Sequence, residues 1–486
     1  MSRVECLHVP AREYACRTPA VSPEPQAPGQ RFFLKVYGCQ MNQYEAGIVR
    51  TILAQAGYRE TYQEEDADVL LMLTCAVRSH AEQRALGRLG TFRRIRSLRP
   101  GRVVGVLGCM SQVLKDALVQ DSAADLIVGP DQYRLLPELI NKVRNNSRPV
   151  VAVGQTNECY EGIIPSVGPA ATASPCRREG IVERAVQVCG LVTVMRGCDN
   201  YCSYCIVPHA RGRERSKPLN QVLAEVRAMT ENGTKDITLL GQNVLAYRAD
   251  EHDFVSLLEQ VSMVPGIERV RFLTSHPRDL TDRVLTAIAS IPKVCPSLHL
   301  PVQSGSNRIL ALMNRGYTRE EYLDKVARAR KLIPGLSLTT DVMVGFPSET
   351  DADFADTLEL IRNVRFDFAY MFRFSARPGT VAAGLSPKVS EAESSRRLAR
   401  LIDVQNRITK ERNSEMVGQG CEILIERPSP RGTQMLGRTP QNRVVIVSGP
   451  CRPGDTVRCR VTGIKGWTPL AQVIQQDDKF LTPNGH

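Results

Sequence analysis

Three cysteines near residue 200 have a spacing that can hold metal. Cys198, Cys202 and Cys205 follow one another as C-x3-C-x2-C within one short stretch. Three thiolates supplied by one loop can ligate three irons of a cubane cluster and leave the fourth iron open to a substrate. A structural zinc site uses four ligands in a closed set, so the alternative is a zinc loop completed by a distant cysteine or by His209.

Three further cysteines lie far apart in the sequence, but each follows an apolar run of strand length. These are Cys39, Cys75 and Cys109, after the runs 32–38, 69–74 and 103–108. Right-handed crossovers would make these strands parallel and bring their carboxyl ends to one edge, where α/β sheets bind ligands. Three thiolates there could hold a second cluster with a free iron. The alternative is three buried cysteines that merely cap strands.

The elements that must position these cysteines fall into two α/β series. In the first, predicted strands at 32–37, 69–73, 103–107 and 126–128 alternate with helices at 46–56, 82–95 and 112–119. In the second, strands at 191–195, 237–240, 270–273, 298–302, 338–344 and 368–372 alternate with helices at 221–230, 254–261, 282–289, 322–332 and 354–361. The first series predicts a parallel α/β sheet and the second a partial or complete β/α barrel.

The C-terminal part changes character after a predicted helix at 393–410. Short alternating strands at 421–425, 444–447 and 455–461 predict a small all-β barrel. Arg438 and Arg443, with Arg427 and Arg431, make its loops basic, which suits single-stranded RNA. The alternative is a solvated basic face. A second basic run at 209–215 follows the cysteine loop and can contact substrate phosphates or simply be solvated.

These patterns give a domain organisation. We predict a disordered leader at 1–30, the α/β domain at 31–148, a linker at 149–183, the barrel at 184–414, the β-barrel at 415–478 and a tail at 479–486. The leader is rich in Pro and Ala, and Gly, Pro, Ala and Ser cluster within the linker, which is typical of segments without a packed core.

Composition limits the class of protein. A chain of 486 residues is too long for one compact core, and its net charge of +12 suits a polyanionic partner. Fifteen cysteines without a secretory signal argue against a disulfide framework and for metal-ligating thiolates. No stretch approaches the roughly 20 apolar residues that cross a bilayer, so a cytoplasmic protein is expected, with no membrane partner.

The C-x3-C-x2-C spacing is that of the radical S-adenosylmethionine superfamily, which the barrel series also resembles. In that family the open iron chelates S-adenosylmethionine, and one electron from the cluster yields a 5′-deoxyadenosyl radical. The resemblance implies that loops after three strands surround the cofactor, through Gly241, Gln242, Asn243, Gln303, Ser304, Gly305 and Gly345. Taken singly, each of these residues could instead serve ordinary loop structure.

The sequences around the dispersed cysteines, at 37–42, 74–83 and 108–110, resemble the N-terminal cluster domain of the methylthiotransferases. The terminal β-barrel resembles the TRAM domain, and the likeness runs from about 31 to 478. It implies an auxiliary 4Fe-4S cluster on Cys39, Cys75 and Cys109, besides the first 4Fe-4S cluster and S-adenosylmethionine. Leu73, Leu245, Ala246 and Ser348 depart from the family's residues near the cluster and the substrate, and none of them removes a cysteine ligand.

Among methylthiotransferases the motifs resemble the MiaB type most. This resemblance implies conversion of N6-isopentenyladenosine beside the tRNA anticodon, at position 37, to its 2-methylthio derivative. The alternatives are threonylcarbamoyladenosine in tRNA and an aspartate of a ribosomal protein. From another class, the rival is a non-catalytic RNA-binding iron-sulfur sensor. We expect tRNA and a flavodoxin- or ferredoxin-type electron donor as partners, and a monomer.

Overall fold

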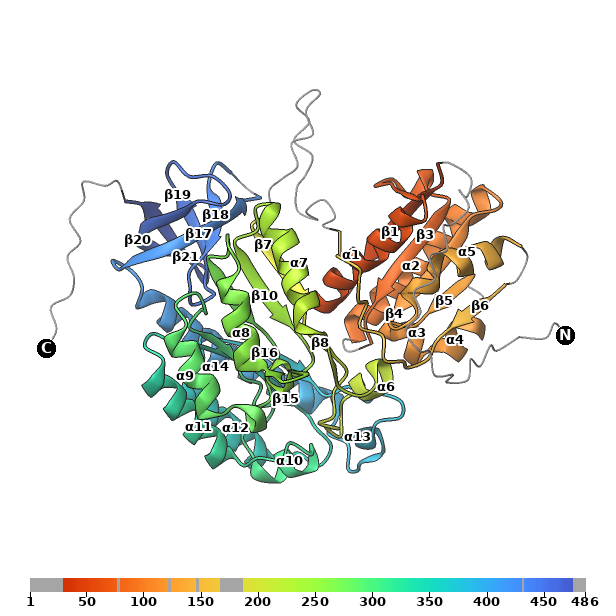
Figure 1. Cartoon of the computed structure of the whole chain (residues 1–486). Helices are drawn as coiled ribbons and strands as arrows, with labels where there is room; N and C mark the ends of the chain where they lie inside the picture. The colour runs from red at the N-terminus through yellow and green to blue at the C-terminus, as the bar shows by residue number, and fades with distance from the viewer. Residues whose placement is uncertain are drawn as a thin grey trace, which may run out of the picture. The chain divides into compact units, whose positions relative to one another are not determined.

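A computed structural model describes residues 29–76, 79–120, 124–145, 148–166, 187–430 and 432–474 (Figure 1). Nearly all of the predicted leader, all of the predicted tail and Arg431 lie outside these ranges. The described residues pack as two compact units, and the first combines those up to 166 with 196–199 and 205–215. Parts of the C-x3-C-x2-C stretch therefore pack with the N-terminal domain. No described helix is long and apolar enough to span a membrane.

The first unit is built on a parallel sheet of strand order β2-β1-β3-β4-β5-β6. Its strands are β1 (Arg31–Val36), β2 (Arg59–Glu60), β3 (Val69–Thr74), β4 (Val103–Gly108), β5 (Leu126–Val128) and β6 (Val150–Ala152). β3 and β4 are buried along their whole length, which explains why both are apolar at every position or nearly so. The predicted parallel α/β sheet is confirmed.

Helices cover both faces of this sheet. They are α1 (Gln40–Gln55), α2 (Ser79–Leu98), α3 (Cys109–Val113), α4 (Lys115–Gln120), α5 (Leu136–Arg144) and the 3-10 turns η1 (Glu64–Asp66) and η2 (Tyr133–Leu135). α2 packs Leu89 and Phe92 against Leu70 and Val104 of the strands. The sequence analysis missed β2, β6 and α5, and the predicted linker is wrong at its start, because 150–152 is a sheet strand. Thr51 and Gly47 of α1 also bond to residues 164 and 166.

The barrel region of the second unit contains two parallel sheets, ordered β13-β10-β7 and β14-β15-β16. The strands are β7 (Cys189–Thr193), β10 (Asp236–Leu240), β13 (Arg269–Phe272), β14 (Ser297–His299), β15 (Ser337–Val344) and β16 (Phe368–Arg373). These are the six predicted strands, and the partial barrel is confirmed. Apolar residues from both sheets share one core, in which Val192, Val270 and Val342 are fully buried.

Helices follow these strands in the predicted order. They are α7 (Leu219–Glu231), α8 (Phe254–Met263), α9 (Asp282–Ser290), α10 (Asn307–Leu312), α11 (Arg319–Leu332), α12 (Asp351–Val364), α13 (Val381–Gly384) and α14 (Glu391–Ser414). Shorter elements are β8 (Met195–Arg196), α6 (Val207–Arg211), β9 (Arg215–Ser216), η3 (Val244–Ala246), β11 (Arg248–Ala249), β12 (His252–Asp253) and η4 (Pro277–Asp279). α11 and α12 begin at capping boxes, Thr318 with Glu321 and Thr350 with Asp353, which satisfy backbone donors that a helix start leaves free.

The C-terminal strands close into a barrel of order β17-β18-β19-β21-β20. They are β17 (Gly420–Pro428), β18 (Met435–Arg438), β19 (Val444–Ser448), β20 (Thr456–Lys465) and β21 (Thr468–Val473). Alternate residues such as Ile423, Val445 and Val461 fill its interior. The small β-barrel is confirmed, although β18 and β21 were not predicted. Arg271 fastens it within the second unit by donating to the carbonyls of Thr439 and Pro440.

Candidate functional site

The dispersed cysteines lie at the carboxyl ends of three adjacent strands. β1 pairs in parallel with β3, and β3 with β4, so Cys39, Cys75 and Cys109 meet at one edge of the sheet. Gly38 makes the close approach possible: its φ is +113°, and a Cβ there would lie 2.4 Å from the Cβ of Cys75. Their predicted placement at one edge is confirmed, while their role as cluster ligands remains a prediction.

The electrostatics of this edge favour a thiolate. A hydrogen bond with Cys75, aided by the guanidinium of Arg211, lowers the pKa of Cys39 to about 6 although burial opposes the shift. Burial raises the pKa of Cys109, and Arg211 offsets only part of that effect. Because metal ligation needs deprotonated sulfur, a buried cation beside two of the cysteines suits a metal centre.

The geometry can be compared with what a cluster requires. Among the described residues, no three His, Cys, Asp or Glu side chains converge to bind one metal ion. In a cubane cluster each cysteine ligates a different iron, so the three thiolates need not converge on one point. Three cysteines at one sheet edge are the number of ligands that a cubane cluster with one open iron takes.

The C-x3-C-x2-C stretch is held by remote parts of the chain. Gly197, with φ +78°, lies so close to the backbone that a Cβ would be 1.9 Å from the carbonyl oxygen of Arg213. The Cys198 amide donates to the carbonyl of Gly212 at 3.2 Å. In the second unit, buried Arg315 donates to the sulfur of Cys202 at 3.3 Å. The guanidinium of Arg315 thus holds the Cys202 sulfur in place by a charge-assisted hydrogen bond.

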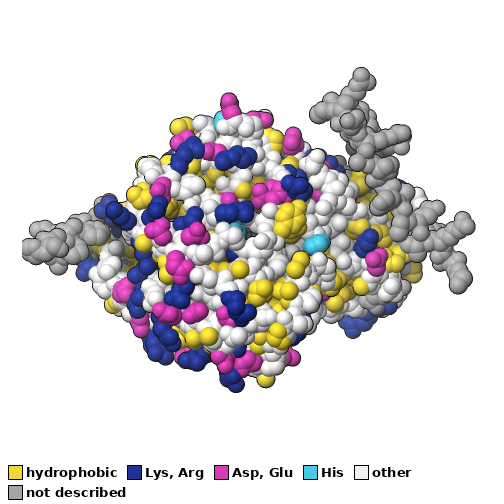
Figure 2. All heavy atoms as spheres, turned by 90° about the horizontal axis from the view of Figure 1, so that it is seen from below, with side chains coloured by type: hydrophobic (Ala, Val, Ile, Leu, Met, Phe, Trp, Pro, Cys, Tyr) yellow, Lys and Arg dark blue, Asp and Glu magenta, His cyan; other side chains and the backbone are white. Residues whose placement is uncertain are grey.

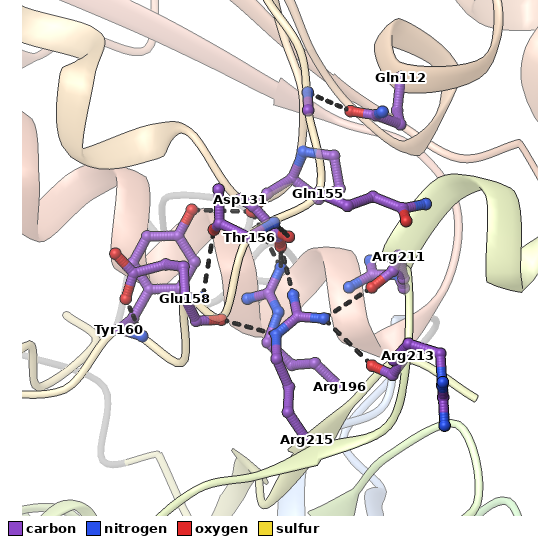
Figure 3. Close-up of polar contacts among 12 residues, drawn as sticks. Gln112, Asp131, Gln155, Thr156, Glu158, Tyr160, Arg196, Arg211, Arg213 and Arg215 are labelled. Carbon is purple, nitrogen blue, oxygen red and sulfur yellow. Dashed lines mark hydrogen bonds and ion pairs between the residues drawn. The ribbon is translucent and has the colours of Figure 1, made fainter. Parts of the chain in front are cut away.

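A network of buried ion pairs lies in the first unit, and Figure 3 shows part of it around Arg196, Arg211 and Arg215. Asp131 binds Arg215 at 2.5 Å and lies 3.5 Å from Arg196. The Arg215 guanidinium also donates to the backbone carbonyls of Glu158 and Arg211 at 3.1 and 2.7 Å. The segment after β6 is therefore a packed part of this unit, where the sequence predicts a linker.

Polar groups without partners mark the carboxyl ends of β10 and β13. Gln242 Oε1, Ser275 Oγ and His276 Nε2 are buried and have no hydrogen-bond partner among the described residues. Burial, followed by the cations Arg315 and Arg278, lowers the pKa of His276 to about 2, so its ring is neutral. Its Nδ1 accepts from a backbone amide, which leaves a proton on Nε2. Such unsatisfied groups fit a polar cofactor such as S-adenosylmethionine.

The predicted cofactor loops divide into two groups. Asn243 links the ends of β10 and β13 by accepting from the His276 amide and donating to Asp279. Gln303 is also near the edge, with φ +70° and a bridge to β15. The structure places the others in tight packing: Cβ atoms on Gly241, Gly305 and Gly345 would meet Met195, Asp356 and Ser394, and Ser304 bonds to Thr357. Their role in cofactor binding remains a prediction.

One face of the β14-β15-β16 sheet is partly open. Leu338, Val342 and Val344 of β15 are buried on the helix side. Asp341, on the other side of the strand, is only partly buried. Phe368 and Tyr370 on β16 are 45% and 47% exposed, with their rings 5.0 Å apart. The Tyr370 ring lies 5.8 Å from His299, which faces Asp341 at 3.5 Å. Since parallel sheets are normally covered on both faces, these aromatic rings suggest a ligand surface.

The two arginines predicted to bind RNA make intramolecular contacts. Arg438 donates to Glu426 at 2.6 Å and to Asn442 at 3.0 Å. Arg443 binds Asp367 and donates to Asn413 at 3.0 Å. The Arg438 side chain thus bonds within the β-barrel, whereas Arg443 ties the β-barrel to Asp367 and Asn413 of the preceding part of the second unit. On the face drawn in Figure 2, Lys and Arg side chains are interspersed with Asp and Glu and form no single basic patch.

Several of these residues escaped the sequence analysis. Glu45, Arg196, Arg315, His276 and Tyr370 belong to no spacing pattern, because their partners are remote in sequence. Arg196 and Arg211 do flank the cysteine loop, and Arg211 also belongs to the basic run at 209–215, so the sequence does offer a signal for these two.

Comparison with known proteins supports the same architecture. Residues 31–129 match the uncharacterized protein family UPF0004, 192–361 the Radical SAM superfamily and 414–474 the TRAM domain. The radical S-adenosylmethionine methyltransferase TsrM from Kitasatospora setae shares the fold, with a TM-score of 0.54, 14% identity and coverage of 73% of this chain and 74% of that one. The cobalamin-dependent enzyme OxsB has a TM-score of 0.50 at 12% identity, covering 78% of this chain and 56% of that one.

Relatives in sequence are much nearer. The tRNA-2-methylthio-N(6)-dimethylallyladenosine synthase of Bacteroides fragilis is 43% identical over 442 residues, covering 89% of this chain and 93% of that protein. That of Moorella thermoacetica is 43% identical over 451 residues, covering 91% and 98%. The predicted methylthiotransferase family, radical barrel and TRAM domain are thereby confirmed. The chain belongs to the family of tRNA-2-methylthio-N(6)-dimethylallyladenosine synthases.

Proposed function

We propose that this radical S-adenosylmethionine methylthiotransferase converts N6-isopentenyladenosine at position 37 of tRNA to its 2-methylthio derivative. The observation that carries the proposal is the 43% identity to such synthases along about nine-tenths of the chain. All six cysteines fall within the ranges 31–129 and 192–361 that match family models, and they lie in two separate sets. An iron-sulfur RNA sensor would not need the second set or the polar groups at the barrel edge.

Each cysteine set has a distinct task in this proposal. Cys198, Cys202 and Cys205 hold the cluster that binds S-adenosylmethionine, and Cys39, Cys75 and Cys109 hold the auxiliary 4Fe-4S cluster. When bound, these groups supply a carbon radical strong enough to break an inert C–H bond, and sulfur for the new bond. Arg315 donates a hydrogen bond to the sulfur of Cys202, while the hydrogen bond with Cys75 and the guanidinium of Arg211 lower the pKa of Cys39.

We infer that the polar ends of β10 and β13 bind S-adenosylmethionine. Gln242 and Ser275 offer oxygens, and neutral His276 offers an N–H donor, all buried and without partners among the described residues. Asn243 keeps the two loops together by its bonds to the His276 amide and to Asp279. A group that completes these hydrogen bonds gains more than it would in water, since the alternative is an unsatisfied buried atom.

The open sheet face suits the modified base. The rings of Phe368 and Tyr370 can stack on an adenine and contact its apolar isopentenyl group, as aromatic side chains do with unpaired bases. Phe368→Ala and Tyr370→Ala should each weaken binding of a tRNA anticodon stem-loop about tenfold. Tyr62→Ala, which removes a 65% exposed ring of the first unit, is the matched control. Unchanged affinity in both test variants would contradict the assignment.

A second RNA surface is proposed on the β-barrel. Arg458 and Arg460 of β20 are exposed, and the adjacent hairpin presents Lys465 and the half-exposed Trp467. Positive side chains beside an exposed ring fit an RNA backbone with a stacked base. We expect Arg460→Ala with Trp467→Ala to lower tRNA affinity and to make its salt dependence shallower. Arg443→Ala should instead lower stability, because that guanidinium pairs with buried Asp367.

We further propose a flavodoxin- or ferredoxin-type reductant, a monomeric enzyme and a location in the cytoplasm, where tRNA is available. The substrate proposal is tested with anaerobically reconstituted enzyme and two RNAs, one with isopentenyladenosine and one with threonylcarbamoyladenosine. Mass spectrometry of the nucleosides should show a methylthio product from the first RNA alone. Turnover of only the second RNA would overturn the substrate while leaving the chemistry intact.

A further inference from the structure

Glu45 is a fully buried carboxylate on α1, the helix that begins directly after Cys39. Its Oε1 accepts from Arg211 at 2.6 Å and from Arg196 at 2.9 Å. Its Oε2 accepts from Arg211 at 3.2 Å and from the Tyr133 hydroxyl at 3.1 Å. Each oxygen of this carboxylate thus accepts two hydrogen bonds, all from side chains of the first unit.

The two arginines come from either side of the C-x3-C-x2-C stretch. Arg196 precedes Cys198 by two residues, and Arg211 follows Cys205 by six residues. α6 ends at Arg211 and lies against the sheet edge that carries the auxiliary cysteines. There, Ile206 and Ala210 pack with Ala76 and Cys109. One carboxylate therefore ties both ends of the radical-cluster loop to the helix that follows the first auxiliary cysteine.

The ion pairs of this network hold one more cation than anion. Arg196, Arg211 and Arg215 carry three positive charges, and Glu45 and Asp131 carry two negative ones. A net buried cation is costly unless an anion lies nearby. Arg211 is the last residue of α6, which packs against Ala76 and Cys109 at the sheet edge. The network is thus built around the auxiliary ligands, and stability alone does not explain it, since buried ion pairs often stabilise no better than apolar residues.

We propose that Glu45 is a positioning residue: through Arg196 and Arg211 it fixes the spacing between the two sets of cluster ligands. The inference rests on the proposed function, in which hydrogen removal and sulfur insertion must occur at one substrate carbon. If the spacing varies, S-adenosylmethionine is still cleaved, but fewer cleavage events lead to product.

The test uses Glu45→Gln, which keeps the shape and removes the charge, in reconstituted full-length enzyme. The ratio of 5′-deoxyadenosine to methylthio product should rise about tenfold. Pulsed EPR of the two reduced clusters, without substrate, should show a broader distance distribution than in the unaltered enzyme. Glu225→Gln is the matched control, because it breaks another fully buried ion pair, with Lys217 at 2.5 Å, in the second unit.

Failure of the inference can be told apart from failure of the proposed function. If Glu45→Gln matches the Glu225→Gln control in both ratio and distance distribution, Glu45 has no positioning role. If the unaltered enzyme makes no methylthio product, the EPR comparison still decides. Should Glu45→Gln lose iron, Arg196→Gln leaves the Glu45–Arg211 pair intact and should give a smaller change in the same direction. Loss of iron in both variants would make Glu45 a folding residue and overturn the proposal.

Discussion

The two cysteine sets are assembled by opposite routes. Cys198, Cys202 and Cys205 are neighbours in the sequence, and a single loop brings them together. The auxiliary cysteines are 34 to 36 residues apart, and they meet because β1, β3 and β4 are adjacent and parallel. The first set needs a loop conformation, whereas the second needs a folded sheet. The comparison teaches that a spacing pattern reveals only ligands of the first kind.

The largest expected effect comes from removing each set in turn. Changing Cys198, Cys202 and Cys205 together to Ala should abolish 5′-deoxyadenosine formation and leave about half the iron, because the other set remains. Changing Cys39, Cys75 and Cys109 to Ala should also leave about half the iron, but it should preserve 5′-deoxyadenosine while eliminating the methylthio product.

Iron analysis and product assays check both variants. The matched control changes Cys189, Cys295 and Cys421 to Ala, three cysteines outside both sets, and should retain the full iron content and activity. Methylthio product from the auxiliary variant, or loss of all iron from either test variant, would break the two-site comparison.

The sequence predicts the loop set and the α/β alternation well, because both are local. It also predicts the sheet edge, since strand ends follow from apolar runs and crossover handedness. It does not predict which cations lie beside the cysteines. Arg315 is 113 residues from Cys202 in the sequence, and Glu45 is 166 residues from Arg211. Such contacts depend on tertiary packing that no periodicity encodes.

The arginines of the β-barrel show a different limit of the sequence. A cluster of basic residues in sequence predicts RNA binding, but Arg438 and Arg443 have acidic partners in the fold. Glu426 lies near Arg438 in the sequence, yet the pairing of β17 with β18 is what brings them together. Charge composition therefore indicates a polyanionic partner more securely than it indicates which residues bind it.

The glycines before the first cysteine of each set provide a sharper test. Gly197→Ala places a Cβ on the Arg213 backbone, and Gly38→Ala places one on Cys75, both at positive φ. Each should impair its own cluster and spare the other, so that Gly197→Ala loses S-adenosylmethionine cleavage and Gly38→Ala loses only the methylthio product. Gly87→Ala, in open space on α2, is the control. Equal loss of both activities in one variant would mean that the sets are not independent.

A smaller effect is expected at the cation beside Cys202. Arg315→Gln removes the charge that bonds to this sulfur, and it should lower the rate of S-adenosylmethionine cleavage about tenfold or more while iron is retained. The auxiliary set should be unaffected, which iron quantification and the EPR signal of its cluster can check. Arg330→Gln removes a partly buried guanidinium of α11 that bonds to a backbone carbonyl instead. If both variants behave alike, the contact with Cys202 has no special role.

The smallest expected effect is a difference in alkylation rate between Cys39 and Cys109 in the iron-free protein. With its pKa lowered to about 6, Cys39 is mostly thiolate at pH 7, so its alkylation rate should be near its plateau there and fall about tenfold by pH 5. Cys109, whose pKa is raised, should stay protonated and react slowly over this range. Cys75→Ala should move the Cys39 midpoint to higher pH, and by more than Arg211→Gln does, because the hydrogen bond with Cys75 is the larger cause. Mass spectrometry of each alkylated peptide gives the rates. A Cys39 midpoint that stays near 9 in the unaltered protein would mean that the sheet edge brings the cysteines together without preparing a thiolate, and the two sets would then differ in placement alone.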